Sequence, residues 1–262
     1  MEFALELQDL LAILSGSAVG FTLALVGGGG SILAVPLLLY VVGVQNPHVA
    51  IGTSALAVSA NAFANLIAHS RAGNVKWPCA VVFGLSGVAG AFAGSTLGKL
   101  VDGEKLVFFF GLVMVAVALA MLRPRQVEGD PNVRINPAIA ARLVGIGLLT
   151  GLLAGFFGIG GGFLIVPGIM LGSGMAMLNA VGSSLFSVGA FGLATASTYA
   201  YDGLVDWRIA AEFVAGGIVG GLAGIAAAKR LSTRKGALNR IFAGLVLAVA
   251  AYVLWRSSAA WA

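Results

Sequence analysis

Two short glycine-rich stretches most strongly constrain how this chain can fold. Val26 to Pro36 reads VGGGGSILAVP and Phe157 to Pro167 reads FGIGGGFLIVP, each inside an otherwise apolar run. Consecutive glycines leave the backbone without side chains and favour a break or a tight turn. At membrane depth, such a break is tolerated only where protein or a polar cavity satisfies the freed backbone groups. Two breaks in equivalent places of two halves are typical of a transporter's binding site.

The rest of the chain consists of apolar runs that approach the length of a membrane span. The sequence is 59% hydrophobic and 10% charged, whereas soluble domains carry about 25% charged residues. Most runs approach the ~20 residues that cross a ~30 Å hydrocarbon core, and the two that hold the glycine clusters are longer. We therefore predict an all-α polytopic membrane protein. The runs fall at roughly 10–43, 48–70, 77–98, 105–122, 138–171, 178–200, 207–228 and 237–255.

The two halves of the chain match each other at a shift of 130 or 131 residues. The glycine clusters match, AIGTS from Ala50 to Ser54 matches AVGSS from Ala180 to Ser184, and AGNVKW from Ala72 to Trp77 matches DGLVDW from Asp202 to Trp207. An ordered series of matches indicates duplication. We predict an N-terminal repeat at 1–122, a polar linker at 123–137 and a C-terminal repeat at 138–262, all in one integral transmembrane domain.

The distribution of Lys and Arg favours inverted repeats. If each long run is a re-entrant hairpin followed by three transmembrane helices, eleven basic residues gather on one side and four on the other. If each long run spans once, they divide eight against seven. The hairpin arrangement follows the positive-inside rule and places both termini outside the cytoplasm. The eleven are Arg71, Lys76, Arg123, Arg125, Arg134, Arg142, Lys229, Arg230, Arg234, Lys235 and Arg240; the four are Lys99, Lys105, Arg208 and Arg256.

Each long apolar run has two possible structures, a hairpin or a single helix. The arms of the first hairpin, about Gly16 to Val26 and Ser31 to Gly43, would be ~15 to 20 Å long and would reach the membrane midplane and return. The alternative is one long helix in each half that the glycines kink or that crosses with a tilt.

Each glycine cluster is a candidate anion site. If the second arm of a hairpin begins at its cluster, its first N–H groups have no partner within the helix, and the helix dipole adds partial positive charge there. Gly28 aligns with Ile159, and Ser31 with Gly162, so the two clusters differ. The predicted substrate-binding positions are Gly27, Gly28, Gly29, Gly30 and Ser31, with Gly158, Gly160, Gly161 and Gly162. Glycines elsewhere, among them Gly87, Gly90, Gly94, Gly217, Gly220 and Gly224, are predicted to let helices pack closely.

Polar side chains that follow each cluster extend the candidate site. Asn61 and Asn65 are spaced i, i+4 and therefore share one helix face. An amide pair in hydrocarbon requires partners, either a neighbouring helix or a ligand. Their repeat equivalents, Phe191 and Thr195, are not amides, so this contribution would be asymmetric. Hydroxyl groups could also donate to an anion, although Ser and Thr in membrane helices more often bond the carbonyl one turn back. These hydroxyl residues are Thr53, Ser54, Ser183 and Ser184.

Few residues suit catalysis or metal binding. The single cysteine, Cys79, and two separated histidines argue against a metal cluster. We find no close carboxylate pair, HExxH motif or Ser, His and Asp set, so we expect neither an enzyme nor a cofactor. The basic residues lie in short gaps between spans, where they set topology, so nucleic acid is not an expected partner. A role for His69 or Glu212 in proton coupling stays open.

At these motifs the chain resembles the sulfite exporter TauE/SafE family of membrane permeases. The resemblance rests on GGGGSILAVP and GIGGGFLIVP, each followed by AIGTS or AVGSS, and on the G-x-V-x-W turn before the next span; it covers about Ser15 to Trp255. It implies export of small sulfur-containing anions such as sulfite, sulfoacetate or related organosulfonates, across a bacterial inner membrane.

We accordingly expect a secondary transporter that alternates access around a midplane site. Its expected partners are a small anionic substrate and membrane lipid. A passive anion channel on the same scaffold is the main alternative, and a membrane-embedded enzyme is a weaker one. The sequence leaves open the substrate, the direction, a coupling proton or sodium ion, and assembly into a homo-oligomer.

Overall fold

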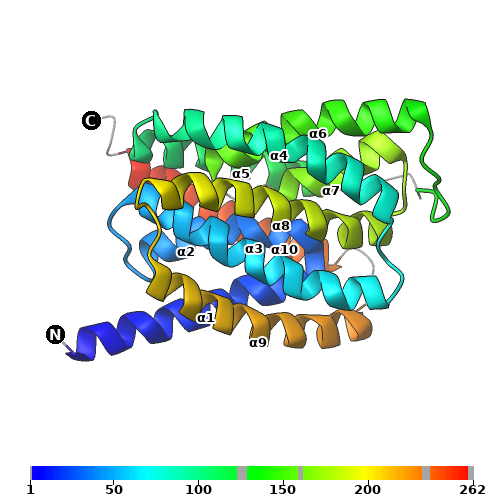
Figure 1. The fold of residues 1–262 in the computed structure, drawn as a ribbon. Coiled ribbons are helices and arrows are strands. Elements are labelled where there is room, and N and C mark those ends of the chain that lie inside the picture. Colours follow the sequence, from blue (N-terminus) through cyan, green and yellow to red (C-terminus); the bar gives the residue numbers. More distant parts are fainter. Residues whose placement is uncertain (1, 123–128, 159–161, 232–236, 259–262) are drawn as a thin grey trace.

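A computed structural model describes residues 2–122, 129–158, 162–231 and 237–258. These residues form α-helices, one 3₁₀-helix and short connections (Figure 1). Seven of the helices are long and apolar enough to cross a membrane, namely α1, α3, α4, α5, α6, α8 and α9. The prediction of an all-α polytopic membrane protein is confirmed. The elements are α1 (Glu2–Val26), η1 (Gly27–Leu33), α2 (Ala34–Tyr40), α3 (Pro47–Arg71), α4 (Trp77–Lys99), α5 (Gly103–Leu122), α6 (Pro137–Phe157), α7 (Gly162–Ser173), α8 (Met177–Tyr201), α9 (Trp207–Leu231) and α10 (Ala237–Ser258).

The chain reverses direction at the first glycine cluster. The 3₁₀-helix η1 begins at the first glycine of the cluster, and α2 then returns alongside α1. As a result, Nε2 of Gln8 near the start of α1 donates to the carbonyl oxygen of Val42, just after α2, at 3.2 Å. A Cβ at Gly30 would lie 2.3 Å from the backbone nitrogen of Leu23 in α1, so the close return requires glycine there. The first long run is therefore a hairpin and not one kinked helix.

The second glycine cluster is also the site of a reversal. Gly158 caps the C-terminus of α6 with a φ of +68°, a left-handed conformation that favours glycine. The helix α7 then runs back along α6. A Cβ on Gly172 would contact the side chain of Leu143 near the start of α6, and one on Gly168 would contact Thr150 in its middle. Residues 159–161, which include most of the cluster, lie outside the described residues.

Both outgoing helices are longer than the predicted arms. At 1.5 Å per residue, the 25 residues of α1 and the 21 of α6 measure about 37 and 31 Å. Near the end of α6, the carbonyl oxygen of Phe156 would lie 2.3 Å from a Cβ on Gly98, in the last turn of α4. The prediction of two similar arms that reverse halfway is therefore wrong. Each outgoing helix spans most of the bundle, and a shorter return helix completes the hairpin.

The two ends of the bundle are defined by where equivalent helices begin. We call the end where α1 begins and α10 ends the terminal end, and the end where α6 begins the linker end (Figure 1). At the terminal end, Arg208 at the start of α9 forms an ion pair with Asp9 of α1. At the linker end, Asn179 in the first turn of α8 donates to the carbonyl oxygen of Asn74, which follows α3. The helices α3, α5 and α9 run from the terminal end to the linker end, and α4, α8 and α10 run back.

Basic residues divide between these ends as the hairpin arrangement predicts. Lys99, Lys105, Arg208 and Arg256 lie at or next to helix ends on the terminal side. Arg123, Arg125, Arg234 and Lys235 fall outside the described residues. The remaining basic residues belong to backbone at or near the linker end: Arg71, Lys76, Arg134, Arg142, Lys229, Arg230 and Arg240.

Helices from opposite halves pack together along stripes of glycine. The helix α4 lies along α6, and α1 lies along α9. A Cβ on Gly151 would be 2.0 Å from the carbonyl oxygen of Gly87, and one on Gly20 would be 1.9 Å from that of Gly217. These distances confirm that glycines outside the clusters serve close helix packing. In the remaining long pairs, α3 lies against α8 in the middle of the bundle, and α5 lies against α10.

Candidate functional site

The elements that follow the two glycine clusters contact each other inside the bundle. The helix η1 packs against α7, which is the return helix of the second hairpin, and against α8. Ser31 and Ile32 in η1 and Ile165 in α7 are buried. Among the predicted positions, Gly27–Gly30 open η1, Gly158 ends α6 and Gly162 begins α7. Gly160 and Gly161 lie outside the described residues.

The two clusters differ in the backbone donors that they offer. The 3₁₀-helix η1 begins at Gly27 directly after the last residue of α1, so its first N–H groups face the last carbonyl groups of α1, whereas α7 begins at Gly162 as a new helix. The first N–H groups of a helix have no partner within that helix. In α7, which has 12 residues, the aligned peptide dipoles add positive potential at this end. The N-terminus of α7 is therefore suited to an anion by its backbone alone. The two clusters themselves lie toward opposite ends of the bundle, because α1 and α6 run in opposite directions and Gly30 packs on Leu23 while Gly158 packs on Ile51.

Thr53 and Ser183 hold turns that belong to the opposite half. Oγ1 of Thr53 accepts a hydrogen bond from the backbone N–H of Asp206 at 2.9 Å, and Oγ of Ser183 accepts one from that of Lys76 at 2.9 Å. Asp206 and Lys76 directly precede the tryptophans that begin α9 and α4. Because Asp206 lies at the terminal end and Lys76 at the linker end, the structure does not bring the two hydroxyls together.

The next hydroxyl in each half is bonded within its own helix. Oγ of Ser54 donates to the carbonyl oxygen of Ile51 at 2.9 Å, and Oγ of Ser184 donates to that of Val181 at 2.7 Å. This is the local bonding that Ser commonly shows in membrane helices. Their protons are therefore engaged in the structure, and neither group points to a ligand.

Asn61 differs from these hydroxyls because its amide has no hydrogen-bond partner among the described residues. It is 0% exposed, and within the described part of the chain neither Nδ2 nor Oδ1 has a hydrogen bond. Its neighbour Asn65 donates from Nδ2 to the Asn61 carbonyl oxygen at 2.9 Å. The amide of Asn61 lies against Gly217 of α9, where a Cβ would be 1.9 Å from Nδ2. The repeat equivalent, Phe191, packs on Gly87 in the same way, so the polar contribution is confined to one half.

A buried amide without a partner costs about 1–3 kcal/mol, so its presence calls for a physical reason. A ligand that accepts from Nδ2 would supply the missing bond. Ser187 of α8 is also buried, and its Oγ has no hydrogen-bond partner in the part of the chain that the structure describes, although the sequence analysis did not select it. The hydrogen bond from Ser59 Oγ to the Gly189 carbonyl oxygen, 2.6 Å, fixes the register of the antiparallel helices α3 and α8. Asn61 comes two residues after Ser59 in α3, and Ser187 comes two residues before Gly189 in α8. Because the two helices are antiparallel, Asn61 and Ser187 lie at one level of the bundle.

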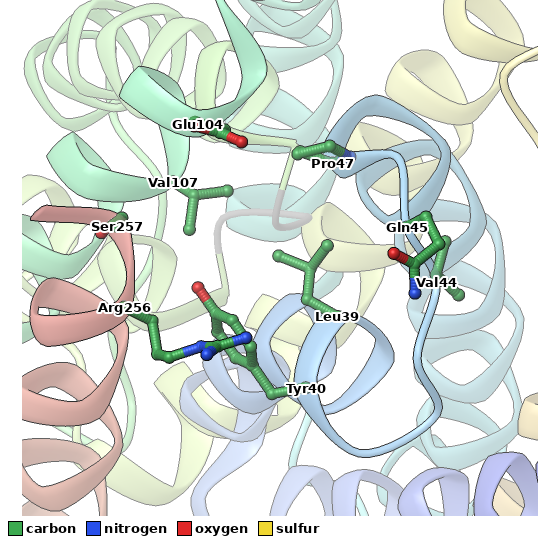
Figure 2. A pocket seen from close by; sticks show the side chains of 9 residues that line it. All are labelled: Leu39, Tyr40, Val44, Gln45, Pro47, Glu104, Val107, Arg256 and Ser257. Atoms are coloured by element: carbon green, nitrogen blue, oxygen red, sulfur yellow. The ribbon is translucent and has the colours of Figure 1, made fainter. Parts of the chain in front are cut away.

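Two adjoining cavities open at the terminal end, and we call them together the vestibule. The smaller has a volume of about 430 Å³ and the larger about 620 Å³. Both are lined by Gln45, Pro47 and Glu104, and the larger also by His48 and Lys99. The smaller is shown in Figure 2, with lining residues Leu39, Tyr40, Val44, Gln45, Pro47, Glu104, Val107, Arg256 and Ser257.

The vestibule lies close to the turn of the second hairpin. A Cβ on Gly158 would be 1.8 Å from Cγ2 of Ile51 in α3. Ile51 comes one helical turn after Pro47, which lines both cavities. One turn of α3 therefore separates the vestibule from Gly158, at the end of the outgoing helix α6.

Comparison with known proteins identifies relatives along nearly the whole chain. The family described as "Sulfite exporter TauE/SafE" matches residues 12–253. A "Probable membrane transporter protein" of Xylella fastidiosa (strain 9a5c) is 54% identical over 257 residues, which are 97% of this chain and 98% of that protein. The "Probable membrane transporter protein YunE" of Bacillus subtilis (strain 168) is 26% identical over 86% of this chain and 90% of its own. No solved structure matches the chain.

Proposed function

Since the chain belongs to the sulfite exporter TauE/SafE family of membrane transporters, we propose that it carries small sulfur-containing anions such as sulfite, sulfoacetate or related organosulfonates across a bacterial inner membrane. The observation that carries this proposal is the contact between two hairpins that reverse at duplicated glycine clusters. In secondary transporters, broken helices of this kind bind anions through their helix N-termini. The direction of export is taken from the family description.

Inverted repeats and alternating access form the mechanistic part of the proposal. Exchanging the two halves turns α1 into α6 and α9 into α4, so the contact of α1 with α9 becomes the contact of α6 with α4. The same exchange leaves the pair α3 and α8 and the pair α5 and α10 unchanged. The helix α1 starts at the terminal end and α6 at the linker end (Figure 1). A two-fold axis in the membrane plane produces both features. Rocking of one repeat against the other would then expose the η1–α7 seam to each side in turn.

The anion site in this proposal combines backbone and one side chain. N–H groups of the first cluster and Nδ2 of Asn61 hold the oxyanion toward the linker end, because Gly30 packs on Leu23 of α1 one turn from the level of Asn61. The N-terminus of α7 offers a second position nearer the terminal end. We assign Thr53, Ser54, Ser183 and Ser184 to the fold, because the bonds described above engage their hydroxyls. By the positive-inside rule, the linker end faces the cytoplasm and the vestibule opens on the other side.

The replacement of Asn61 by leucine tests this site. Proteoliposomes loaded with labelled sulfite would be compared for efflux, and unfolding by denaturant would be followed in detergent. Asn61→Leu removes the unpartnered amide, so we expect transport to fall at least tenfold and the free energy of unfolding not to fall. Ser59→Ala is the matched control on the same helix. It loses a paired hydrogen bond, worth about 1 kcal/mol, and should retain transport. If Asn61→Leu carried sulfite out at the wild-type rate, Asn61 would not belong to the anion site.

Two further experiments test the anion site and the transport mechanism separately. Gly29→Val fills the first cluster with a side chain, and we expect it to stop transport while the protein still inserts in the membrane. Efflux that saturates with sulfite concentration and is accelerated by sulfite on the opposite side would support a transporter. Efflux that rises linearly with concentration would support the passive channel instead.

A further inference from the structure

The smaller cavity of the vestibule carries one positive and one negative side chain. Arg256 comes from α10 and Glu104 from α5, and Figure 2 shows them on different walls of the cavity. The guanidinium carbon of Arg256 lies 6.0 Å from the centre of the Tyr40 ring, an arrangement in which the ring supports the cation. Among the described residues, no ion pair joins Arg256 and Glu104 to each other or to a third side chain. Both charges therefore remain available to a ligand.

The other walls are suited to a short hydrocarbon segment. Leu39, Val44 and Val107 contribute apolar surface, and Gln45 adds a neutral polar group. The volume, about 430 Å³, lies within the usual range of ligand pockets, roughly 300–1,000 Å³. A molecule with a charged group at each end and a few carbons between them matches this arrangement.

We propose that this cavity binds a small zwitterion, namely a sulfonic or carboxylic acid that carries an amine on a short carbon chain. The acid group is held by Arg256, whose planar fork of donors fits an acid in a bidentate manner. The ammonium group is held by the Glu104 carboxylate. A simple anion is disfavoured, because Glu104 repels it, while Asp102 and Lys99 in the adjoining cavity carry opposite charges. A simple amine is disfavoured by Arg256 in the same way.

This site is distinct from the seam between the hairpins. It stands at the terminal end and is built from α2, α5, α10, the segment before α3 and the first residue of α3, none of which carries a glycine cluster. The proposal does not rest on the transported substrate, because binding is measured without transport. If sulfite flux proves absent while a zwitterion binds, only the proposed function fails.

The experiment measures binding to the full-length protein in nanodiscs of zwitterionic lipid by isothermal titration calorimetry. The probes are 2-aminoethanesulfonate and 3-aminopropanesulfonate, with ethanesulfonate and propylamine as singly charged counterparts. We expect saturable binding of at least one aminosulfonate, and at least tenfold weaker binding of both counterparts. Equal binding of ethanesulfonate and the aminosulfonates, or no binding of either aminosulfonate, would overturn the proposal.

Three neutralising variants assign the binding to the cavity. Arg256→Gln should abolish binding of the aminosulfonates. Glu104→Gln should lower the affinity for the aminosulfonates at least tenfold. Because the repelling carboxylate is gone, it should raise the affinity for ethanesulfonate. Lys105→Gln is the control, since it removes a charge beside Glu104 from a residue outside both cavity linings. It should change affinity by less than twofold. Thermal unfolding of each variant in nanodiscs checks that the fold is retained. A Glu104→Gln protein that folds and keeps the wild-type preference would refute the assignment.

Discussion

The substitution Gly151→Ala tests the packing that joins the two halves. Gly151 lies on the face of α6 that contacts α4, and its added Cβ would be 2.0 Å from the carbonyl oxygen of Gly87. Ordinary van der Waals contact begins near 3.4 Å, so the helices would have to separate by about 1.4 Å at this point. Neither the added Cβ nor the Gly87 carbonyl oxygen belongs to a flexible side chain that can move aside. A shift of helix α6 is therefore the available response.

The expected cost follows from that shift. A gap of about 0.5–1 Å already removes a quarter to a half of the attraction between two atoms. The neighbouring contact of Gly155 with Ala91 would be opened by the same movement. Overpacking of a well-packed interior typically costs about 1–3 kcal/mol, and we expect Gly151→Ala to lie at the upper end, near 3 kcal/mol.

Gly145→Ala is the matched control in the same helix. A Cβ at Gly145 meets no atom within 4 Å, and the position is exposed. Alanine should stabilise the helix there by about 0.5–1 kcal/mol, because glycine loses more backbone entropy on folding. Both variants would be unfolded by increasing fractions of SDS in mixed micelles and followed by circular dichroism. A difference between them of less than about 1 kcal/mol would refute the proposed close packing.

Three other predictions concern single polar contacts. Thr53→Val leaves the backbone N–H of Asp206 without its acceptor and should lower the free energy of unfolding by about 1–2 kcal/mol, measured in the same micelles; an unchanged value would show that water replaces the threonine. Ser183→Ala should behave in the same way at the other end of the bundle, because it frees the N–H of Lys76. Asp202→Asn breaks the ion pair with Lys99, but Asp202 is 42% exposed, so a loss below about 1 kcal/mol is expected. That loss should shrink in concentrated salt, and a loss that salt leaves unchanged would indicate a different cause.

The hairpins could be predicted because two independent features of the sequence indicate them. The glycine clusters marked where the chain breaks, and the distribution of Lys and Arg required both ends of each long run to lie on one side. The depth of the turns could not be predicted from the same signals. A run of apolar residues sets the total length of both arms, but it does not say how that length is divided between an outgoing helix such as α6 and a return helix such as α7.

The polar residues show a different limit. Ser54 and Ser184 bond within their own helix, which is a local preference that the sequence can express. The partner of Thr53, by contrast, is 153 residues away, and no local pattern identifies a backbone N–H at that distance. Asn61 was selected for its residue type and spacing. That its amide lies against Gly217 of another helix and has no partner among the described residues could be seen only after the helices were placed.

The pairing of α1 with α9 has a consequence for biosynthesis. Gly16 near the middle of α1 packs against the backbone of Phe213, so the first helix to be made waits for about 200 further residues before its main partner exists. At ~5–20 residues per second, this delay is about 10–40 s. Insertion of α1 into the membrane and its final packing are therefore separate events. During the interval, the glycine face of α1 contacts lipid or the insertion machinery, and a chain that terminates before α9 leaves that face permanently uncovered.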